Sequence, residues 1–174
     1  MKLKMNSITR IAMMTALLAI CSWITIPFAV PFTMQTFAVF LALIICGGVE
    51  GSIAIAVYIA LGAVGIPVFS GFSGGVSALI GPTGGYIFGF LLSGGVKILF
   101  EKIFGREKLL PVSLLAGLLV CYLCGTVYYT LIMNGRGGSY TLWSALMVCV
   151  VPFIIPDIIK LCLAILIGRK LPKK

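Results

Sequence analysis

The chain has 174 residues, of which 61% are hydrophobic and only 10% are charged, and its mean hydropathy is +1.21. Because soluble domains carry about a quarter charged residues, this composition indicates an integral membrane protein, and six spans of about 20 residues would leave no room for a fused ATPase or soluble catalytic domain. Histidine is absent, which excludes histidine-based catalysis and histidine-ligated metal sites.

Hydropathy, proline and glycine divide the chain into six predicted membrane helices and one short outer helix, so the predicted fold is an all-α integral membrane protein with a single transmembrane domain. The first helix ends before Pro27, and the second ends before Gly47. Pro152 favours a helix start, so we expect a short outer helix and then a span, rather than one kinked helix. The predicted spans are 7–26, 32–46, 51–64, 82–104, 110–133 and 152–171, and the short outer helix is 140–151.

The segment 65–86, GIPVFSGFSGGVSALIGPTGGY, lies between the third and fourth predicted helices and contains seven glycines. It is apolar, yet this glycine content disfavours one regular helix. Non-helical backbone at membrane depth is stable only where protein buries it or where it lines a polar cavity. We therefore expect an ordered, glycine-rich outer loop that forms a lid over a pocket.

The distribution of Lys and Arg predicts the orientation in the membrane. With the N-terminus inside, eleven of these residues fall on the inner side and only Arg136 falls outside, so both termini are predicted to be cytoplasmic. The net charge of +9 is interpreted as a topology signal and an attraction to anionic lipid, with no role in binding nucleic acid. The inner residues are Lys2, Lys4, Arg10, Lys97, Lys102, Arg106, Lys108, Arg169, Lys170, Lys173 and Lys174.

Asp157 and Lys160 in the last predicted helix are the strongest candidates for a functional site. Three residues apart, they share one helix face, one to two turns below the outer surface. Each ionisable side chain in a span costs about 2.5 to 3.5 kcal/mol on insertion scales, so the pair requires a role. We favour a binding site because the pair lies level with the glycine-rich loop; an ion pair that only pins this helix is the alternative.

Other residues near the outer face could contribute to a pocket. Gln35, flanked by Thr33 and Thr36, can both donate and accept hydrogen bonds, although a capping or interhelical role is equally compatible. Cys121 and Cys124 form a CxxC pair, but in an apolar helix without a second pair we interpret them as packing residues rather than metal or redox groups. Aromatic residues that could form flat walls are Phe69, Phe72, Tyr86 and Trp143.

Small residues at four-residue spacing in the first helix, Ala12 and Ala16, would let another helix approach closely. The spacing leaves open whether that helix belongs to this chain or to a second protein.

Three motifs in order, VPFTMQTFAV, then GIPVFSGFSGG with GPTGGY, then PFIIPDIIK, strongly resemble the BioY family, the biotin-specific S components of energy-coupling factor (ECF) transporters. The resemblance implies a six-helix subunit of the bacterial plasma membrane that captures biotin from outside. It implies that Ala12 and Ala16 contact the transmembrane coupling subunit, and that two ABC ATPases hydrolyse ATP in trans. It also implies no enzymatic activity and no cofactor on this chain. The substrate-binding residues that it implies are Gln35, those of the 81–86 run, which include Gly81, Thr83, Gly84 and Tyr86, and Asp157 and Lys160. Phe69 and Ser73 of the glycine-rich loop are further candidates for substrate binding.

Two other functions are alternatives. A stand-alone, proton-coupled secondary transporter would use Asp157 as the proton carrier, but the chain shows no internal inverted repeat of the kind such folds favour. An intramembrane enzyme would need a nucleophile with a base, or a metal set. Without histidine and with only four carboxylates, that set is missing.

Overall fold

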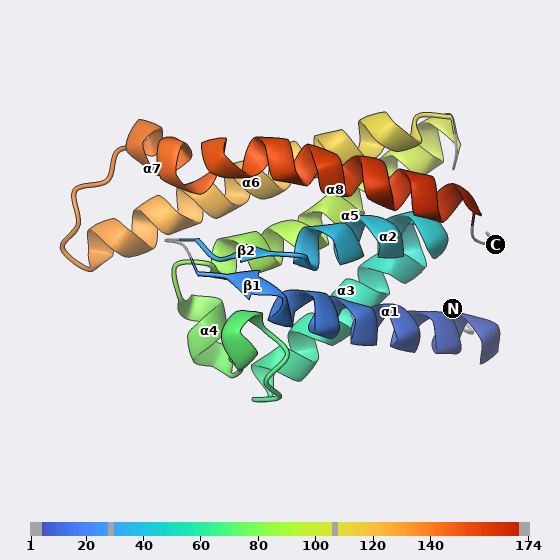
Figure 1. The fold of residues 1–174 in the computed structure, drawn as a ribbon, viewed down its shortest axis with the longest axis horizontal. Helices are drawn as coiled ribbons and strands as arrows, with labels where there is room; N and C mark the ends of the chain where they lie inside the picture. The colour runs from blue at the N-terminus through green and yellow to red at the C-terminus, as the bar shows by residue number, and fades with distance from the viewer. Residues whose placement is uncertain (1–4, 28–29, 106–107, 171–174) are drawn as a thin grey trace.

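The computed structural model describes residues 5–27, 30–105 and 108–170, and within these ranges the regular secondary structure is helical apart from one small hairpin (Figure 1). The long helices run roughly along one common direction. The elements are α1 Met5–Trp23, β1 Thr25–Ile26, β2 Phe32–Thr33, α2 Gln35–Ile45, α3 Gly47–Ala63, a 3-10 turn Ser70–Phe72, α4 Val76–Ile80, α5 Gly84–Phe104, α6 Leu110–Gly135, α7 Leu142–Cys149 and α8 Val151–Lys170.

The β1–β2 hairpin shortens the first two helices relative to the prediction. Thr25 pairs with Thr33 and Ile26 with Phe32, in antiparallel register. A residue before proline disfavours the helical conformation, and Ile26 precedes Pro27, so α1 stops before this point. As a result α2 has 11 residues and is about 16 Å long, which is too short to cross a bilayer core of about 30 Å by itself.

Two other helix starts differ from the prediction. The third helix begins at Gly47 rather than at residue 51, because Gly47 adopts a φ of 81° and lets the chain turn from α2 directly into α3. Helix α5, which corresponds to the fourth predicted span, begins at Gly84 rather than at residue 82. At the end of the chain, residues 142–149 and 151–170 form two helices with a break at Val150, and Pro152 lies in the first turn of α8. Residue 171, the predicted end of the last helix, lies outside the described residues.

Close packing of α5 against α6 forms much of the bundle (Figure 1). Glycines make this approach possible. A Cβ atom at Gly89 would lie 2.8 Å from the Sγ of Cys121, and one at Gly125 would lie 2.3 Å from the ring of Tyr86. Helices in lipid associate through such packing, because lipid removes the hydrophobic driving force between them.

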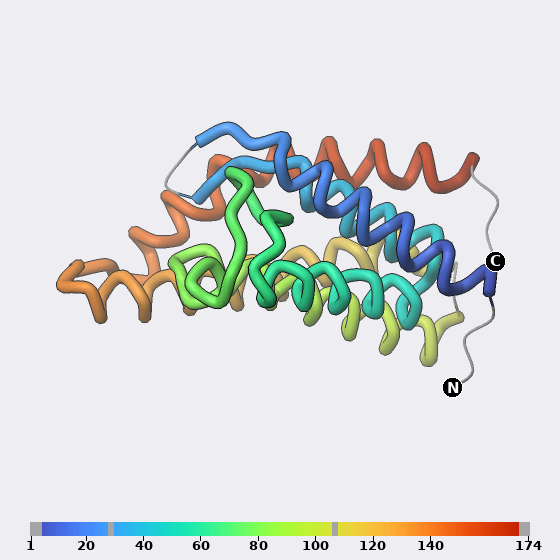
Figure 2. Tube along the Cα trace, turned by 90° about the horizontal axis from the view of Figure 1, so that it is seen from below, coloured from blue at the N-terminus to red at the C-terminus, as the bar shows by residue number. Residues whose placement is uncertain are grey.

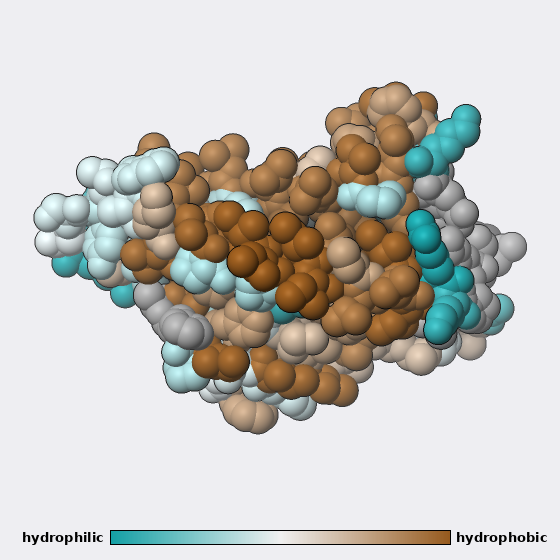
Figure 3. Space-filling model, turned by 45° about the horizontal axis from the view of Figure 1, so that its top comes forward, coloured by the Kyte–Doolittle hydropathy of each residue, from teal (hydrophilic) through white to brown (hydrophobic). Residues whose placement is uncertain are grey.

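Three described helices, α1, α6 and α8, are long and apolar enough to cross a membrane, and α2 and α3 are shorter apolar helices. Figure 3 shows a wide hydrophobic band on the face drawn, with polar side chains at both ends of the molecule. The beginning of α1 and the end of α8 lie at the same end of the bundle (Figures 1 and 2). The protein is therefore a multi-pass helical membrane protein.

Buried charged groups join α1, α3 and α5 at the end of the bundle where α1 begins. Ser7 donates a hydrogen bond from Oγ to Oε1 of Glu50 at 2.9 Å, and both residues are buried. Lys97 lies 3.3 Å from Oε1 of Glu101, and the backbone N–H of Gly48 donates to Oε2 of Glu101 at 3.0 Å. This group of contacts holds the start of α3 between the other two helices.

Candidate ligand-binding site

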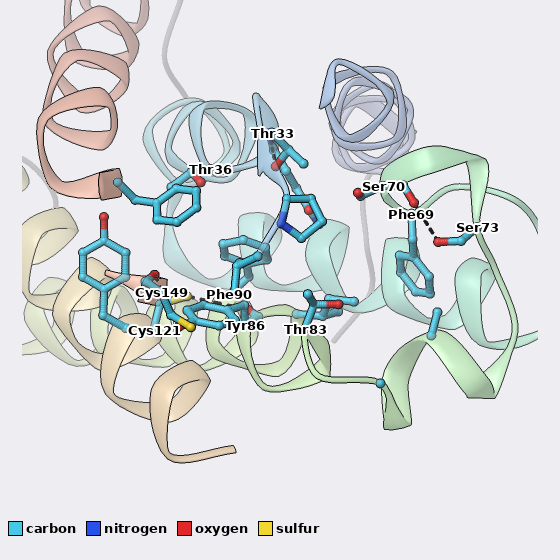
Figure 4. Close-up of a pocket in the computed structure, with 18 of the residues that line it drawn as sticks. Thr33, Thr36, Phe69, Ser70, Ser73, Thr83, Tyr86, Phe90, Cys121 and Cys149 are labelled. Carbon is cyan, nitrogen blue, oxygen red and sulfur yellow. Dashed lines mark hydrogen bonds between the residues drawn. The ribbon is translucent and has the colours of Figure 1, made fainter. Parts of the chain in front are cut away.

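A cavity of about 360 Å³ lies near the end of the bundle that carries the hairpin, between α2, α5, α6, α8 and the segment that joins α3 to α5. Figure 4 shows Tyr86 and Phe90 of α5 on one side of it, with Thr36 of α2 opposite. We refer to residues 65–81 as the lid, because they form one wall of the cavity and contain no long helix.

Asp157 and Lys160 line the cavity and are almost completely buried, with exposed fractions of 3% and 4%. Nζ of Lys160 donates to Oδ1 of Asp157 at 2.8 Å and to the backbone oxygen of Thr33 at 2.7 Å. The same ammonium lies 4.0 Å from the centre of the Phe32 ring, within the range of a cation–π contact. The pair therefore connects α8 to the β2 strand.

Tyr122 of α6 completes this polar group and was not predicted from the sequence. Its hydroxyl donates to Oδ2 of Asp157 at 2.6 Å, so each carboxylate oxygen accepts one hydrogen bond from the protein. A carboxylate oxygen has two lone-pair sites, which leaves acceptor capacity for a ligand. A tyrosine among the apolar residues of α6 was the available indication, but several tyrosines there look alike in sequence.

Gln35 connects the cavity to the lid through a second tyrosine. Nε2 of Gln35 donates to the hydroxyl of Tyr58 at 3.0 Å, and that hydroxyl donates to the backbone oxygen of Val68 at 3.0 Å. Both side chains are buried. Gln35 therefore lines the cavity and also makes the interhelical contact that the sequence left open for it.

The lid is also bonded to the end of α1. Ser22 donates from Oγ to the backbone oxygen of Val68, and Nε1 of Trp23 donates to the backbone oxygen of Pro67 at 2.8 Å. The Trp23 ring stacks on Phe72 with centroids 5.1 Å apart. Figure 2 shows the lid reaching from the end of α3 toward the end of α1. These contacts keep the glycine-rich segment in one ordered conformation.

The ring of Phe69 holds the lid against Gly62 of α3. A Cβ atom at Gly62 would lie 2.0 Å from Cζ of Phe69, so the ring occupies the space that any side chain at position 62 would need. Gly62→Ala is expected to displace Phe69 and to weaken ligand binding at least tenfold, as measured by titration of the purified protein. The control is Gly95→Ala in α5, where an added Cβ meets nothing within 4 Å. Equal affinities for the two variants would contradict this role of Phe69.

Most of the residues proposed for the site from the sequence lie at this cavity. Gly84 does not line it, because Gly84 packs against the backbone oxygen of Leu79 in the turn that starts α5. Phe72 and Trp143 are 63% and 68% exposed and form no part of the wall. The proposed residues that do line it are Gln35, Phe69, Ser73, Gly81, Thr83, Tyr86, Asp157 and Lys160. Lining residues that the sequence did not indicate include Phe90, Leu118, Tyr122, Cys149 and Phe153.

Ala12 and Ala16 lie on the side of α1 that faces away from the bundle. Both are exposed, whereas Ile11 and Thr15 are buried, and Oγ1 of Thr15 donates to the backbone oxygen of Ala54 in α3 at 3.1 Å. The small-residue stripe is therefore not used for packing within the described chain.

A bundle of apolar helices that encloses a cavity with a buried ion pair under an ordered lid defines a membrane protein that binds a small polar solute. The chain belongs to the BioY family, whose model matches residues 1–174. The resemblance seen in the sequence is thereby confirmed.

Relatives and a solved structure agree with this assignment. The chain is 40% identical to the biotin transporter BioY of Thermotoga maritima, over 97% of each protein. It is 36% identical to a probable biotin transporter BioY of Pyrococcus horikoshii, over 97% of this chain and 98% of the relative. The fold matches a crystal structure of the S-component for biotin from an ECF-type ABC transporter, with a TM-score of 0.84 and 25% identity, over 99% of this chain and 97% of the other. These relatives are transporters, which agrees with the expectation that the chain is not an enzyme.

Proposed function

We propose that this protein is the biotin-binding S component of an ECF-type ABC transporter and mediates biotin uptake. The observation that carries the proposal is the buried Asp157–Lys160 pair, hydrogen-bonded by Tyr122, inside a cavity under an ordered lid. The relatives described as biotin transporters and the similar biotin S-component supply the substrate.

The chemistry of the pair suits the cyclic urea of biotin. A urea presents two N–H donors and one carbonyl acceptor. The Asp157 carboxylate retains lone pairs for an N–H donor, and Lys160 has three N–H donors, of which two are used by Asp157 and Thr33. In our proposal Asp157 accepts from the ureido N–H groups, and Lys160 donates to the ureido oxygen or orients Asp157.

Apolar walls next to the pair suit the rest of the bicyclic ring. Phe90 and Phe153 line the cavity together with Tyr86, and Phe69 belongs to the lid side of it. A flat, mostly apolar ring system gains affinity from such aromatic surfaces. We assign Gln35, Ser73, Gly81 and Thr83 to the polar contacts around the ring and its side chain. In this proposal Gly84 shapes the turn and does not touch the ligand.

The transport complex that we propose follows the resemblance. Six membrane segments form a single transmembrane domain with both termini in the cytoplasm, and α1 docks on the transmembrane coupling subunit through Ala12 and Ala16. Two ABC ATPases supply ATP hydrolysis in trans, because no nucleotide-binding motif occurs in this chain. Relatives occur in a bacterium and in an archaeon, and we propose a bacterial plasma membrane for this protein.

Direct titration tests the substrate. The protein is expressed in cells grown without biotin, purified in detergent and titrated with biotin by calorimetry, with thiamine and riboflavin as control ligands. We expect saturable binding of biotin alone, with one molecule bound per chain. Binding of another vitamin, and not biotin, would overturn the substrate while leaving the fold unaffected. Uptake that persists without ATP and without partner subunits, and that collapses with the proton gradient, would instead support a secondary transporter.

A further inference from the structure

The cavity has two chemically different ends. Asp157 and Lys160 lie at a closed end, where both are buried. Ser73 and Ser77 of the lid also line the cavity, yet both are exposed, so the cavity reaches solvent at this side. Figure 4 places Ser70 and Ser73 on one side of the cavity and Cys121 and Cys149 on the other. We call the side formed by Ser70, Ser73 and Ser77 the mouth.

The mouth carries no charge. No Lys or Arg occurs anywhere in the sequence between Arg10 and Lys97, and the only acidic residue in that interval is Glu50, which does not line the cavity. Among the described residues that line the cavity, the only ones charged at neutral pH are Asp157 and Lys160, which neutralise one another at 2.8 Å. The remaining outer cation, Arg136, is not part of the wall.

This distribution determines how an acid such as biotin would lie. A carboxylate placed at the closed end would meet the like charge of Asp157 beside a Lys160 ammonium that is already paired with it, whereas N–H donors there meet an acceptor. The acid side chain of the ligand therefore belongs at the mouth, next to neutral hydroxyls and solvent. A serine hydroxyl both donates and accepts, so it serves a carboxylate and an amide about equally. Nothing on the wall of the mouth selects for a negative charge.

We propose that the same site also binds biotin whose carboxyl group is joined to an amine, that is, biotin amides, with the attached group leaving the cavity between the lid serines and solvent. The inference rests on the proposed function, because it assumes that the urea occupies the closed end. It adds a ligand class to the site: conjugated biotin as well as the free acid.

Competition binding tests the inference. Wild-type protein loaded with radiolabelled biotin is challenged with unlabelled biotin, biotinamide, the amide of biotin with lysine, and biotin methylated on one ureido nitrogen. We expect both amides to bind with affinities within about tenfold of that of free biotin. The methylated compound is expected to bind at least a hundredfold more weakly than biotin. Amides that bind a hundredfold more weakly than biotin would overturn the inference and leave the proposed function standing. Failure of biotin itself to bind would overturn the proposed function.

A substitution at the mouth provides a second, independent test. Ser77→Lys places a cation where the structure has none and should raise the preference for the acid over the amide about threefold to fivefold, as expected for a partly exposed ion pair. Added salt should reduce that gain. Ser77→Gln, which is polar but neutral, should leave the acid-to-amide ratio unchanged. An unchanged ratio for Ser77→Lys at low salt would show that the carboxylate lies elsewhere and would overturn the inference.

Discussion

Replacement of Asp157 by Asn is expected to weaken biotin binding by about a hundredfold or more. Asn keeps the size of the side chain but removes the negative charge that pairs with Lys160. It also replaces one acceptor oxygen by an NH₂ donor, which cannot accept a hydrogen bond from the ureido N–H groups. A hydrogen bond to a charged group contributes about 1.5 to 3 kcal/mol, and about 1.4 kcal/mol changes an affinity tenfold, so the loss of the bonds from the ureido N–H groups accounts for this effect. Calorimetric titration of the purified variant measures the effect.

The matched control is Glu50→Gln. Glu50 is also a buried carboxylate, and it accepts a hydrogen bond from Ser7, but it does not line the cavity. This variant undergoes the same chemical change and is expected to bind biotin as tightly as the wild type, even if it unfolds at a lower temperature. An Asp157→Asn protein that bound biotin with wild-type affinity would remove the basis for the site assignment.

Ala16→Trp is expected to abolish ATP-dependent uptake while leaving biotin binding intact. Ala16 is exposed on the side of α1 that faces away from the bundle, and it does not line the cavity. A large side chain there therefore disturbs no ligand contact. Close approach of two helices in lipid requires small residues at the contact, and an indole would keep the coupling subunit at a distance. The measurements are biotin uptake by cells that co-express the coupling subunit and both ATPases, and copurification of those subunits.

Leu123→Trp serves as the control for added bulk in the membrane. Leu123 lies on α6, is 67% exposed and does not line the cavity, so the same indole at that position should leave both uptake and complex formation unchanged. If Ala16→Trp supported uptake at the wild-type rate, α1 would not be the docking helix. If Ala16→Trp lost biotin binding as well as uptake, the substitution would act on the ligand-binding cavity rather than on the contact with the coupling subunit.

The charged residues of the cavity could be predicted because a charged side chain has a high free energy of insertion into a membrane. Asp157 and Lys160 stand out in an apolar span, and their spacing places them on one face of α8, where the structure brings Nζ and Oδ1 to 2.8 Å. Glycine content likewise indicated a non-helical lid, which the structure divides into a 3-10 turn and a five-residue helix. In both cases the local sequence determines the local outcome.

Features that depend on tertiary contacts were missed. The β1–β2 hairpin has two residues in each strand, too few for an alternating pattern to appear. Tyr122 became recognisable only when the fold placed its hydroxyl 2.6 Å from Asp157. Gly84 belonged to a motif of the family, yet its position is determined by the backbone of Leu79 rather than by the cavity.

The contacts of α1 with the lid have a mechanical consequence. Pro67 and Val68 are bonded to Trp23 and Ser22, whereas Ala12 and Ala16 lie farther along the same rigid helix. Any movement that opens the entrance must either break these bonds or tilt α1 as it proceeds. The same helix therefore links the entrance of the cavity to the surface that we expect to meet the coupling subunit.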